Sequence, residues 1–542
     1  MQLSRKNKIL NFSFCLFLAL LIGLLIGTYL IPSKSKHVFY INPFDNKIEE
    51  VTHLLQHYYF EELTINDIND EAIVALLQSL DPFSSYIPKK DAQRYDEALT
   101  GKFDGIGIQF NILHDTVLVV NVVPNGPSQK VGLMPGDKII VVDGETIAGV
   151  GIQNEDVIQK LRGKKGTKVS LSVLRSGISK PIDYEIIRDK IPLESINVAY
   201  MIDDKIGYIL IDNFTITTGD EFTKALNKLL LQNMKQLILD LRGNPGGFLG
   251  ASLEICDHFF KNKELIVYTQ GYHAGKEEYK ATRKGLFQNA DQQLIILIDE
   301  WSASASEIIA GAVQDNDRGL IIGRRSFGKG LVQRQFYLKD SSELMLTVAR
   351  YYTPSGRCIQ KPFDKNLISD YDILDYYKNG ELNNMDSSLF ADSLKYTTAK
   401  GRTVYGGGGI MPDVFIPLKT SDSIVYFNKL ASQGIVFTYA MEYVDKNRKR
   451  LLQYKTVEQF EKQFTVNENM LREIMNKGAE KGLPVSEATA YSKQEIRKWT
   501  KAYIARNLFN MNDFYKIINK DDEVIKKAVE ILKKEQNLFS LN

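Results

Sequence analysis

Residues 294–314 read LIILIDEWSASASEIIAGAVQ and join an apolar run to a segment with helical spacing. The run from Leu294 to Asp299 predicts a buried strand, and the residues from about Ser304 to Gln314 predict a helix. The same alternation continues on both sides, with strands expected at 206–211, 236–241 and 320–323 and helices at 218–232 and from after 247 to about 260. This order predicts an α/β core with a largely parallel sheet and crossover helices.

The spacing of apolar residues and turn residues divides the rest of the chain into regions around this core. Residues 37–100 have helical spacing, 101–190 hold short β-rich runs separated by turns, and 419–542 are rich in Lys, Glu, Leu and Tyr at helical spacing. The α/β core is expected to span 191–418, with an irregular insertion at 361–400. The chain is therefore predicted to be a multidomain α/β protein with a helical N-terminal region, a β-rich module and an all-helical C-terminal extension.

The amino-terminal segment predicts a membrane anchor. Basic residues at positions 5, 6 and 8 precede an apolar run from Ile9 to Ile31, which as a helix would span about 34 Å. The basic leading side favours a cytoplasmic N-terminus. A cleaved signal peptide is the alternative, but no small-x-small cleavage site follows the run. Residues 1–36 are thus expected to be an anchor and stalk. The expected location is the bacterial cytoplasmic membrane, crossed once, with the catalytic body on the periplasmic side.

Composition narrows the class of protein. Of 542 residues, 44% are hydrophobic and 25% are charged, which is the balance of a globular protein with an ample core. The formal net charge of +2 gives no argument for nucleic acid as a partner. Three cysteines are too few for a disulfide scaffold, although a pair between Cys256 and Cys358 stays open. No H-E-x-x-H motif and no Cys/His cluster occurs, so neither a metal nor another cofactor is expected.

Three serines alternate with small residues where the apolar strand gives way to a helix, at positions 302, 304 and 306. A hydroxyl at that place can point into a cleft, with amides of the helix N-terminus nearby for a developing oxyanion. The alternative is a helix cap with small residues for close packing. A serine nucleophile also needs a base, and none of the six histidines falls at a strand end beside this segment.

Lysine is the other candidate base, since burial lowers its pKa toward neutrality. Lys329 lies between Gly328 and Gly330, and Gln333 would share its side of the strand that follows. A surface lysine in a glycine turn is the alternative. The segment also fits the phosphate loop G-x-x-x-x-G-K, but Gly330 replaces the required Ser or Thr, so nucleotide binding is not favoured.

A glycine loop, Gly105-Ile106-Gly107-Ile108, precedes the first strand pattern of the β-rich module. Such a loop at a sheet edge can present amides to the terminal carboxylate of a peptide while the edge pairs with the peptide backbone. An ordinary hairpin turn is the alternative.

Six motifs follow one another along the chain: Leu80-Asp-Pro-Phe-Ser-Ser-Tyr86, Gly132-Leu-Met-Pro-Gly-Asp-Lys138, Asp240-Leu-Arg-Gly-Asn-Pro-Gly-Gly247, Ser302-Ala-Ser-Ala-Ser-Glu-Ile308, Phe327-Gly-Lys-Gly-Leu-Val-Gln333 and Tyr351-Tyr-Thr-Pro-Ser-Gly356. Together they closely resemble the C-terminal processing peptidases, also called tail-specific proteases. The resemblance runs from about Ile48 to Pro417, roughly two-thirds of the chain. It implies that 101–190 is a PDZ module and 191–418 a Ser–Lys peptidase core.

The resemblance also implies roles for individual residues. Ser304 matches the nucleophile, Lys329 the general base and Gln333 the supporting amide. The oxyanion hole would use the backbone amides of Ala305 and of a glycine in the Gly246–Gly247 pair, most simply Gly247. Three more residues match positions used around the dyad: Glu307, Asp315 and Ser326.

The implied function is a membrane-anchored serine endopeptidase that cleaves envelope proteins near their C-terminal ends. Its PDZ module, through the loop 105–108, would recognise the free C-terminus of a protein or peptide substrate. The expected partners are such substrates and the membrane, with the C-terminal helical region as a contact for a homo-oligomer or an adaptor. Two alternatives stay open: a non-catalytic PDZ scaffold, and a signalling peptidase for a single membrane-bound regulator.

Overall fold

The computed structural model describes residues 47–282, 285–289, 291–363, 380, 382–383, 392–418 and 422–534. The chain divides into two compact units, 1–72 and 73–542. In the first unit, helix α2 (Lys47–Tyr58) buries none of its side chains. Helix α3 (Ile65–Gln78) begins in this unit and ends in the second.

The expected localisation is corrected by the helices of the structure. Among the described residues, none forms a helix that is both long and apolar enough to span a bilayer. The single-pass location in the cytoplasmic membrane, with a periplasmic catalytic body, is wrong on this finding. The segment predicted as anchor and stalk, residues 1–36, lies outside the described residues.

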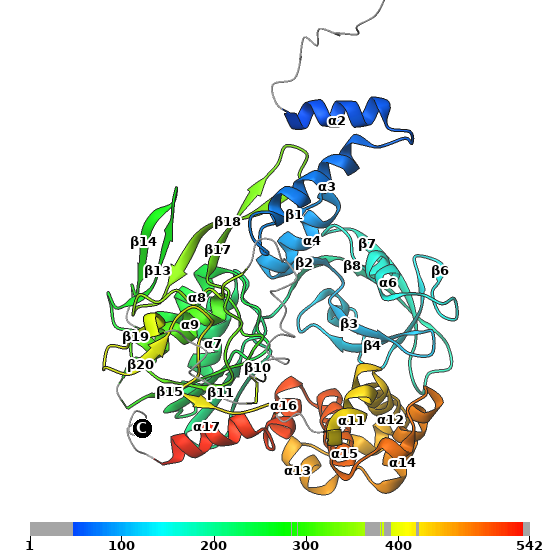
Figure 1. The fold of residues 1–542 in the computed structure, drawn as a ribbon. Helices are drawn as coiled ribbons and strands as arrows, with labels where there is room; N and C mark the ends of the chain where they lie inside the picture. The colour runs from blue at the N-terminus through cyan, green and yellow to red at the C-terminus, as the bar shows by residue number, and fades with distance from the viewer. Residues whose placement is uncertain are drawn as a thin grey trace, which may run out of the picture. The chain divides into compact units, whose positions relative to one another are not determined.

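Residues 108–187 of the second unit form an antiparallel sheet in the order β3-β4-β5-β7-β8 (Figure 1). These strands are Ile108–Ile112, Val117–Val122, Lys138–Val142, Lys168–Leu174 and Ile182–Ile187, with β6 (Glu145–Thr146) pairing β5. Strand β7 alternates buried and open positions, so that Val169, Leu171 and Val173 enter the core beneath helix α6 (Asn154–Leu161). A short ladder of β2 (Lys102–Gly105) and β9 (Asp189–Pro192) closes the two ends of this region.

The second region is a six-stranded sheet in the order β10-β11-β12-β15-β16-β21. Its strands are Val198–Met201, Ile206–Leu210, Gln236–Asp240, Gln293–Ile298, Leu320–Gly323 and Val414–Phe415. All neighbours from β11 onward are parallel, and β10 alone runs antiparallel among them. The predicted α/β core is thereby confirmed.

Both faces of this parallel sheet are covered, which explains its unbroken apolar strands. Ile296 and Ile298 face helices α7 (Thr218–Leu230), α8 (Leu249–Cys256) and α9 (Ala305–Asp315). Ile295 and Leu297 face the opposite way, against helix α17 (Glu523–Lys533) near the C-terminus. The last helix among the described residues, α17, is therefore a layer of the α/β core.

A separate five-stranded sheet is also antiparallel and carries residues of the candidate site. It joins β1 (Ser85–Ile87), β13 (Leu265–Gly271), β14 (Gly275–Lys280), β17 (Leu331–Tyr337) and β18 (Glu343–Tyr352). Helix α4 (Lys89–Thr100) follows β1. Most of the insertion expected at 361–400 lies outside the described residues, but β19 (Lys395–Thr397) pairs with β20 (Thr403–Tyr405). Cys256 and Cys358, the pair left open, are free thiols.

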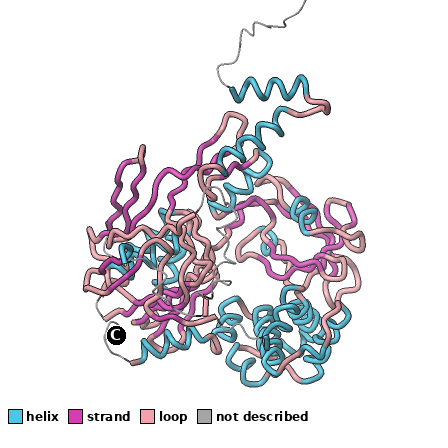
Figure 2. The backbone as a smooth tube through the Cα atoms, in the orientation of Figure 1, coloured by secondary structure: helices cyan, strands magenta, loops and turns pink. Residues whose placement is uncertain are grey.

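Residues 422–519 are helical, as predicted, and Figure 2 shows these helices without strands between them. The helices are α11 (Asp422–Ser432), α12 (Ile435–Leu451), α13 (Val457–Gln463), α14 (Glu468–Glu480), α15 (Ala490–Leu508) and α16 (Met511–Asn519). Their core takes in Leu118 and Val120 of β4, so the helices pack on the antiparallel β-rich region.

Candidate active site

The three alternating serines have different surroundings. Ser302 and Ser306 are fully buried, and their hydroxyls donate to the carbonyl oxygens of Leu241 (2.8 Å) and Asn244 (3.1 Å). Both hydroxyls thus tie the start of α9 to the loop after β12. Ser304 is only half-buried and has φ +52° and ψ −110°, a conformation that a non-glycine residue rarely adopts. Ser304 is also the N-cap of α9 and forms a capping box with Glu307. It is the least buried of the three serines, and its strained backbone is typical of functional sites.

Glu307 connects this serine to the lysine loop. It is fully buried in the first turn of α9 and accepts the Ser304 amide at 2.8 Å and the Lys329 amide at 2.9 Å. The same carboxylate accepts the Ser326 hydroxyl (2.6 Å) and the Gly328 amide (2.7 Å). Burial raises the pKa of Glu307 to about 7, and these four hydrogen bonds act against that rise.

Tyr351 makes the same connection from β18. Its hydroxyl donates to the carbonyl oxygen of Lys329 at 2.7 Å and lies 3.2 Å from that of Ser304. Two buried side chains, one on each side, therefore hold the backbones of Ser304 and Lys329 together.

The amine of Lys329 is largely shielded from solvent. Its Nζ donates to Oε1 of Gln333 at 2.7 Å and lies 4.9 Å from the ring centre of Phe83. The amide of Gln333 in turn donates to the carbonyl of Phe83, which fixes its orientation. Burial lowers the pKa of Lys329, although Glu307 and Asp81 oppose that shift by attraction. The predicted pairing of lysine and glutamine is present in the structure.

The glycine pair approaches Ser304 closely. A Cβ on Gly246, where φ is +96°, would lie 2.7 Å from the Cβ of Ser304 and 2.7 Å from the carbonyl of Ala303. Only glycine fits such an approach. The Gly246 amide donates to the side chain of Asn244 at 2.8 Å. The amides of Gly247 and Ala305, by contrast, donate no hydrogen bond within the described ranges. One of these amides follows Ser304 directly in the chain, and the other follows the glycine that lies against Ser304.

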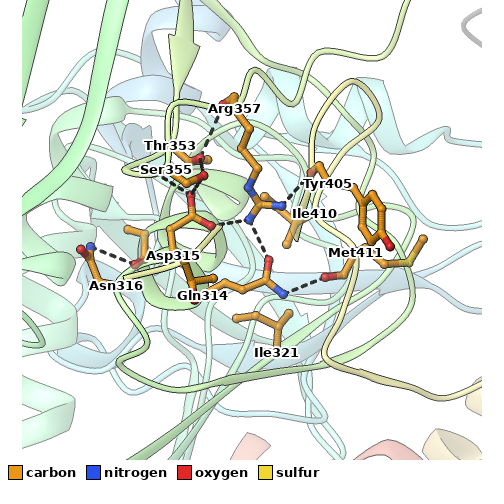
Figure 3. A network of polar contacts seen from close by, with 12 residues as sticks. Gln314, Asp315, Asn316, Ile321, Thr353, Ser355, Arg357, Tyr405, Ile410 and Met411 are labelled. Carbon is orange, nitrogen blue, oxygen red and sulfur yellow. Dashed lines mark hydrogen bonds and ion pairs between the residues drawn. The ribbon is translucent and has the colours of Figure 1, made fainter. Parts of the chain in front are cut away.

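Helix α9 is anchored at its far end by a buried arginine (Figure 3). Arg357 is fully buried, and its guanidinium donates to Asp315 Oδ1 (2.7 Å), Gln314 Oε1 (2.7 Å) and the carbonyl of Tyr405 (2.8 Å). Asp315 also accepts the hydroxyl of Ser355 at 2.7 Å. The network joins the helix that begins after Ser304 to the segment following β18, so it fixes the axis of that helix.

The loop 105–108 lines a cavity of about 280 Å³ at the edge of the antiparallel β-rich region. All four predicted residues, Gly105 to Ile108, contribute to its wall. The other lining residues are mostly apolar: Phe103, Gln109, Phe110, Val123, Ile158, Leu161, Arg162, Ile191, Pro192 and Leu193. The cavity combines a glycine loop with an apolar wall, which suits an apolar chain end with a carboxylate.

Sequence reasoning missed three residues that shape the site. Asn244 is fully buried and holds the glycine loop by donating to the Ile211 carbonyl at 2.8 Å. Phe83 contributes both its ring and its carbonyl to the lysine environment. All three residues occur in the motifs of the sequence, but the motifs assign them no individual role. An Asn before Pro is a turn signal, but the long-range partners of these residues cannot be read from local spacing.

Comparison with known proteins places the chain in a family. The model of peptidase family S41 matches residues 205–372, a PDZ domain matches 105–186, and a family of unknown function matches 426–510. The carboxy-terminal processing protease CtpB of Bacillus subtilis is 34% identical over 319 residues, covering 58% of this chain and 65% of the relative. CtpA of the same organism is 33% identical over 347 residues, covering 62% of this chain and 73% of the relative.

A solved structure of the PDZ domain of a carboxy-terminal protease from Vibrio cholerae, in complex with peptide, is 37% identical to this chain. The match covers 17% of this chain and 99% of the solved PDZ domain, with a TM-score of 0.16. The chain spans slightly less than two thirds of CtpB and more than two thirds of CtpA. On the peptidase and PDZ matches and these relatives, the chain belongs to the C-terminal processing peptidases, a family of serine-type endopeptidases, and carries a PDZ domain.

Proposed function

We propose that the chain cleaves proteins near their C-terminal ends with Ser304 as nucleophile and Lys329 as general base. The observation that carries this proposal is the shared support of the two residues. Glu307 binds both backbone amides and Tyr351 contacts both carbonyls, while Gln333 holds the desolvated lysine amine. A base whose pKa is lowered by burial suits proton transfer near neutral pH.

The proposed reaction is acyl transfer through a Ser–Lys dyad. Neutral Lys329 takes the proton of the Ser304 hydroxyl, and the serine oxygen attacks the scissile carbonyl carbon. The amides of Gly247 and Ala305 donate to the oxyanion, and the Lys329 ammonium gives its proton to the leaving amine as the C–N bond breaks. Water then hydrolyses the ester by the same route and regenerates the free serine. Gly246 is the weaker donor candidate, because Asn244 already accepts its amide hydrogen.

The PDZ domain is proposed to bind the free C-terminus of the substrate. The cavity beside Gly105–Ile108 has an apolar wall, which favours substrates with apolar terminal residues. The glycine loop would receive the terminal carboxylate. The boundaries proposed for the chain are 1–36, 37–100, 101–190, 191–418 and 419–542, although helix α17 of the last region packs on the core sheet of 191–418.

The test compares cleavage of an unstructured protein with an apolar C-terminus by the full chain and four variants. Ser304→Ala and Lys329→Ala are expected to abolish cleavage. Lys329→Arg keeps the positive charge but cannot act as a base at neutral pH, so it is expected to be equally inactive. Ser432→Ala changes an exposed serine of α11 and serves as the control. Cleavage by Ser304→Ala would reject the nucleophile. No cleavage by the unaltered chain would favour the PDZ scaffold.

A further inference from the structure

The C-terminal helix α17 reaches the loop that carries the glycine pair. Asp522 is the N-cap of this helix, and its Oδ1 accepts the Ile525 amide at 2.9 Å. Its Oδ2 accepts Nη1 of Arg242, also at 2.9 Å. One carboxylate therefore both starts the helix and binds the loop after β12.

Arg242 is held on two sides. Its Nε and Nη2 bind Asp240, the last residue of β12, with the Nη2 to Oδ2 distance at 2.6 Å. Asp240 is almost fully buried and also accepts the hydroxyl of Tyr208 at 2.8 Å. Both carboxylates favour the charged guanidinium and raise the pKa of Arg242, against the effect of burial. The arginine thus joins the end of a core strand to the extension.

This arrangement fixes the beginning of the glycine loop. Arg242 is followed directly by Gly243, whose amide donates to Asp299 at 2.9 Å, and then by Asn244, which holds the amide of Gly246. The loop therefore has anchors at successive positions before Gly247. Arg242 is the first of them and contacts the helical extension through Asp522.

We propose that Asp522 is a positioning residue of the peptidase, acting through Arg242 on the place of the Gly247 amide. The inference rests on the proposed oxyanion role of that amide. Without the carboxylate, Arg242 would face the positive end of α17, since the N-terminus of a helix carries partial positive charge. The guanidinium would then lose one partner and meet repulsion, and the loop would gain freedom.

The expected signature is a loss in kcat with little change in KM. The Gly247 amide would bind the oxyanion, which exists in the transition state and not in the bound substrate. A purely structural role for Asp522 would lower thermal stability without separating these two constants.

The experiment uses the full chain with three substitutions. Asp522→Ala removes both the cap and the contact with Arg242. Asp522→Asn keeps an oxygen that can cap the helix and accept from Arg242, but removes the charge. Asn467→Ala is the matched control, because Asn467 caps α14 in the same extension by accepting the Met470 amide at 3.0 Å. The measurements are kcat and KM on the unstructured substrate, thermal unfolding, and hydrogen exchange of residues 241–248 by mass spectrometry.

Asp522→Ala is expected to lower kcat roughly tenfold or more, as a displaced oxyanion donor would. Its loop should exchange hydrogen faster, Asp522→Asn should lie between it and the unaltered chain, and Asn467→Ala should change neither quantity. Unchanged exchange of residues 241–248 in Asp522→Ala would overturn the proposal, whatever its activity. If the unaltered chain shows no cleavage that depends on Ser304, the proposed function fails, while the exchange measurement still decides the role of Asp522.

Discussion

Substituting Gly246 by alanine should lower kcat by two to three orders of magnitude while leaving the chain folded. The added Cβ would lie 2.7 Å from the Ser304 Cβ, 2.7 Å from the Ala303 carbonyl and 3.1 Å from the Ala305 amide nitrogen. The first two are backbone or Cβ contacts closer than real atoms allow, so the loop or the serine must move by several tenths of an ångström. The φ of +96° adds about 1–3 kcal/mol of backbone strain.

The size of the effect follows from what such a movement displaces. Loss of one oxyanion donor lowers kcat by about 100- to 1000-fold, and Gly246 lies between Asn244 and the donor candidate Gly247. Gly243→Ala is the matched control in the same loop. Its φ is +70°, so it also introduces strain, but its Cβ would meet no atom within 4 Å.

The assay measures kcat and KM on the unstructured substrate together with urea unfolding of both variants. Both should lose about 1–2 kcal/mol of stability because both place a side chain at positive φ, and Gly246→Ala should lose more because its Cβ must also displace neighbouring atoms. Only Gly246→Ala should lose kcat by two to three orders of magnitude. A Gly246→Ala variant whose kcat stays within about threefold of Gly243→Ala would refute the close-approach reasoning.

Three further predictions concern charge and recognition. Burial lowers the pKa of Lys329, so Phe83→Ala, which should admit water to the amine, is expected to raise that pKa. The rise of kcat/KM with pH should then move to a higher pH. An unshifted profile would count against a role for the ring. Glu307 has a pKa of about 7 in the folded chain, against an ordinary value of 4.5. Between these two pH values the folded state binds more protons than the unfolded state. The free energy of unfolding should therefore fall by about 3 kcal/mol as pH rises from about 4.5 to 7. Urea titrations at several pH values check this, and Glu307→Gln should be less stable and lack that slope. Amidation of the substrate C-terminus should raise KM about tenfold or more by removing the carboxylate expected at Gly105–Ile108; equal KM values for the acid and the amide would reject C-terminal recognition.

The parts of the fold that depend on local periodicity could be predicted from sequence. The strands expected at 236–241 and 294–299 are Gln236–Asp240 and Gln293–Ile298, because a strand buried on both faces shows as an unbroken apolar run. The contact between Lys329 and Gln333 is present as the sequence predicts, but strand alternation is not its cause. Strand β17 begins only at Leu331, and its pairing with β18 shifts register between Val332 and Gln333.

Contacts between distant segments could not be predicted. The sequence predicts residues 419–542 as an all-helical extension, yet helix α17 in this range covers one face of the core sheet, and Asp522 binds Arg242 across 280 residues of sequence. The amphipathic pattern of α17 indicates that one of its faces is buried, but the pattern does not identify the element that covers this face. Likewise, Phe83 and Lys329 are far apart in sequence, and only folding brings the ring near the amine.

The most direct test of the Ser304–Lys329 dyad is covalent labelling with a fluorophosphonate, followed by mapping of the modified residue by mass spectrometry. The dyad predicts a single adduct on Ser304, formed faster as pH rises toward the lowered pKa of Lys329 and lost in both Ser304→Ala and Lys329→Ala. An adduct on another residue, or labelling of Ser304 at an unchanged rate in Lys329→Ala, would contradict the dyad.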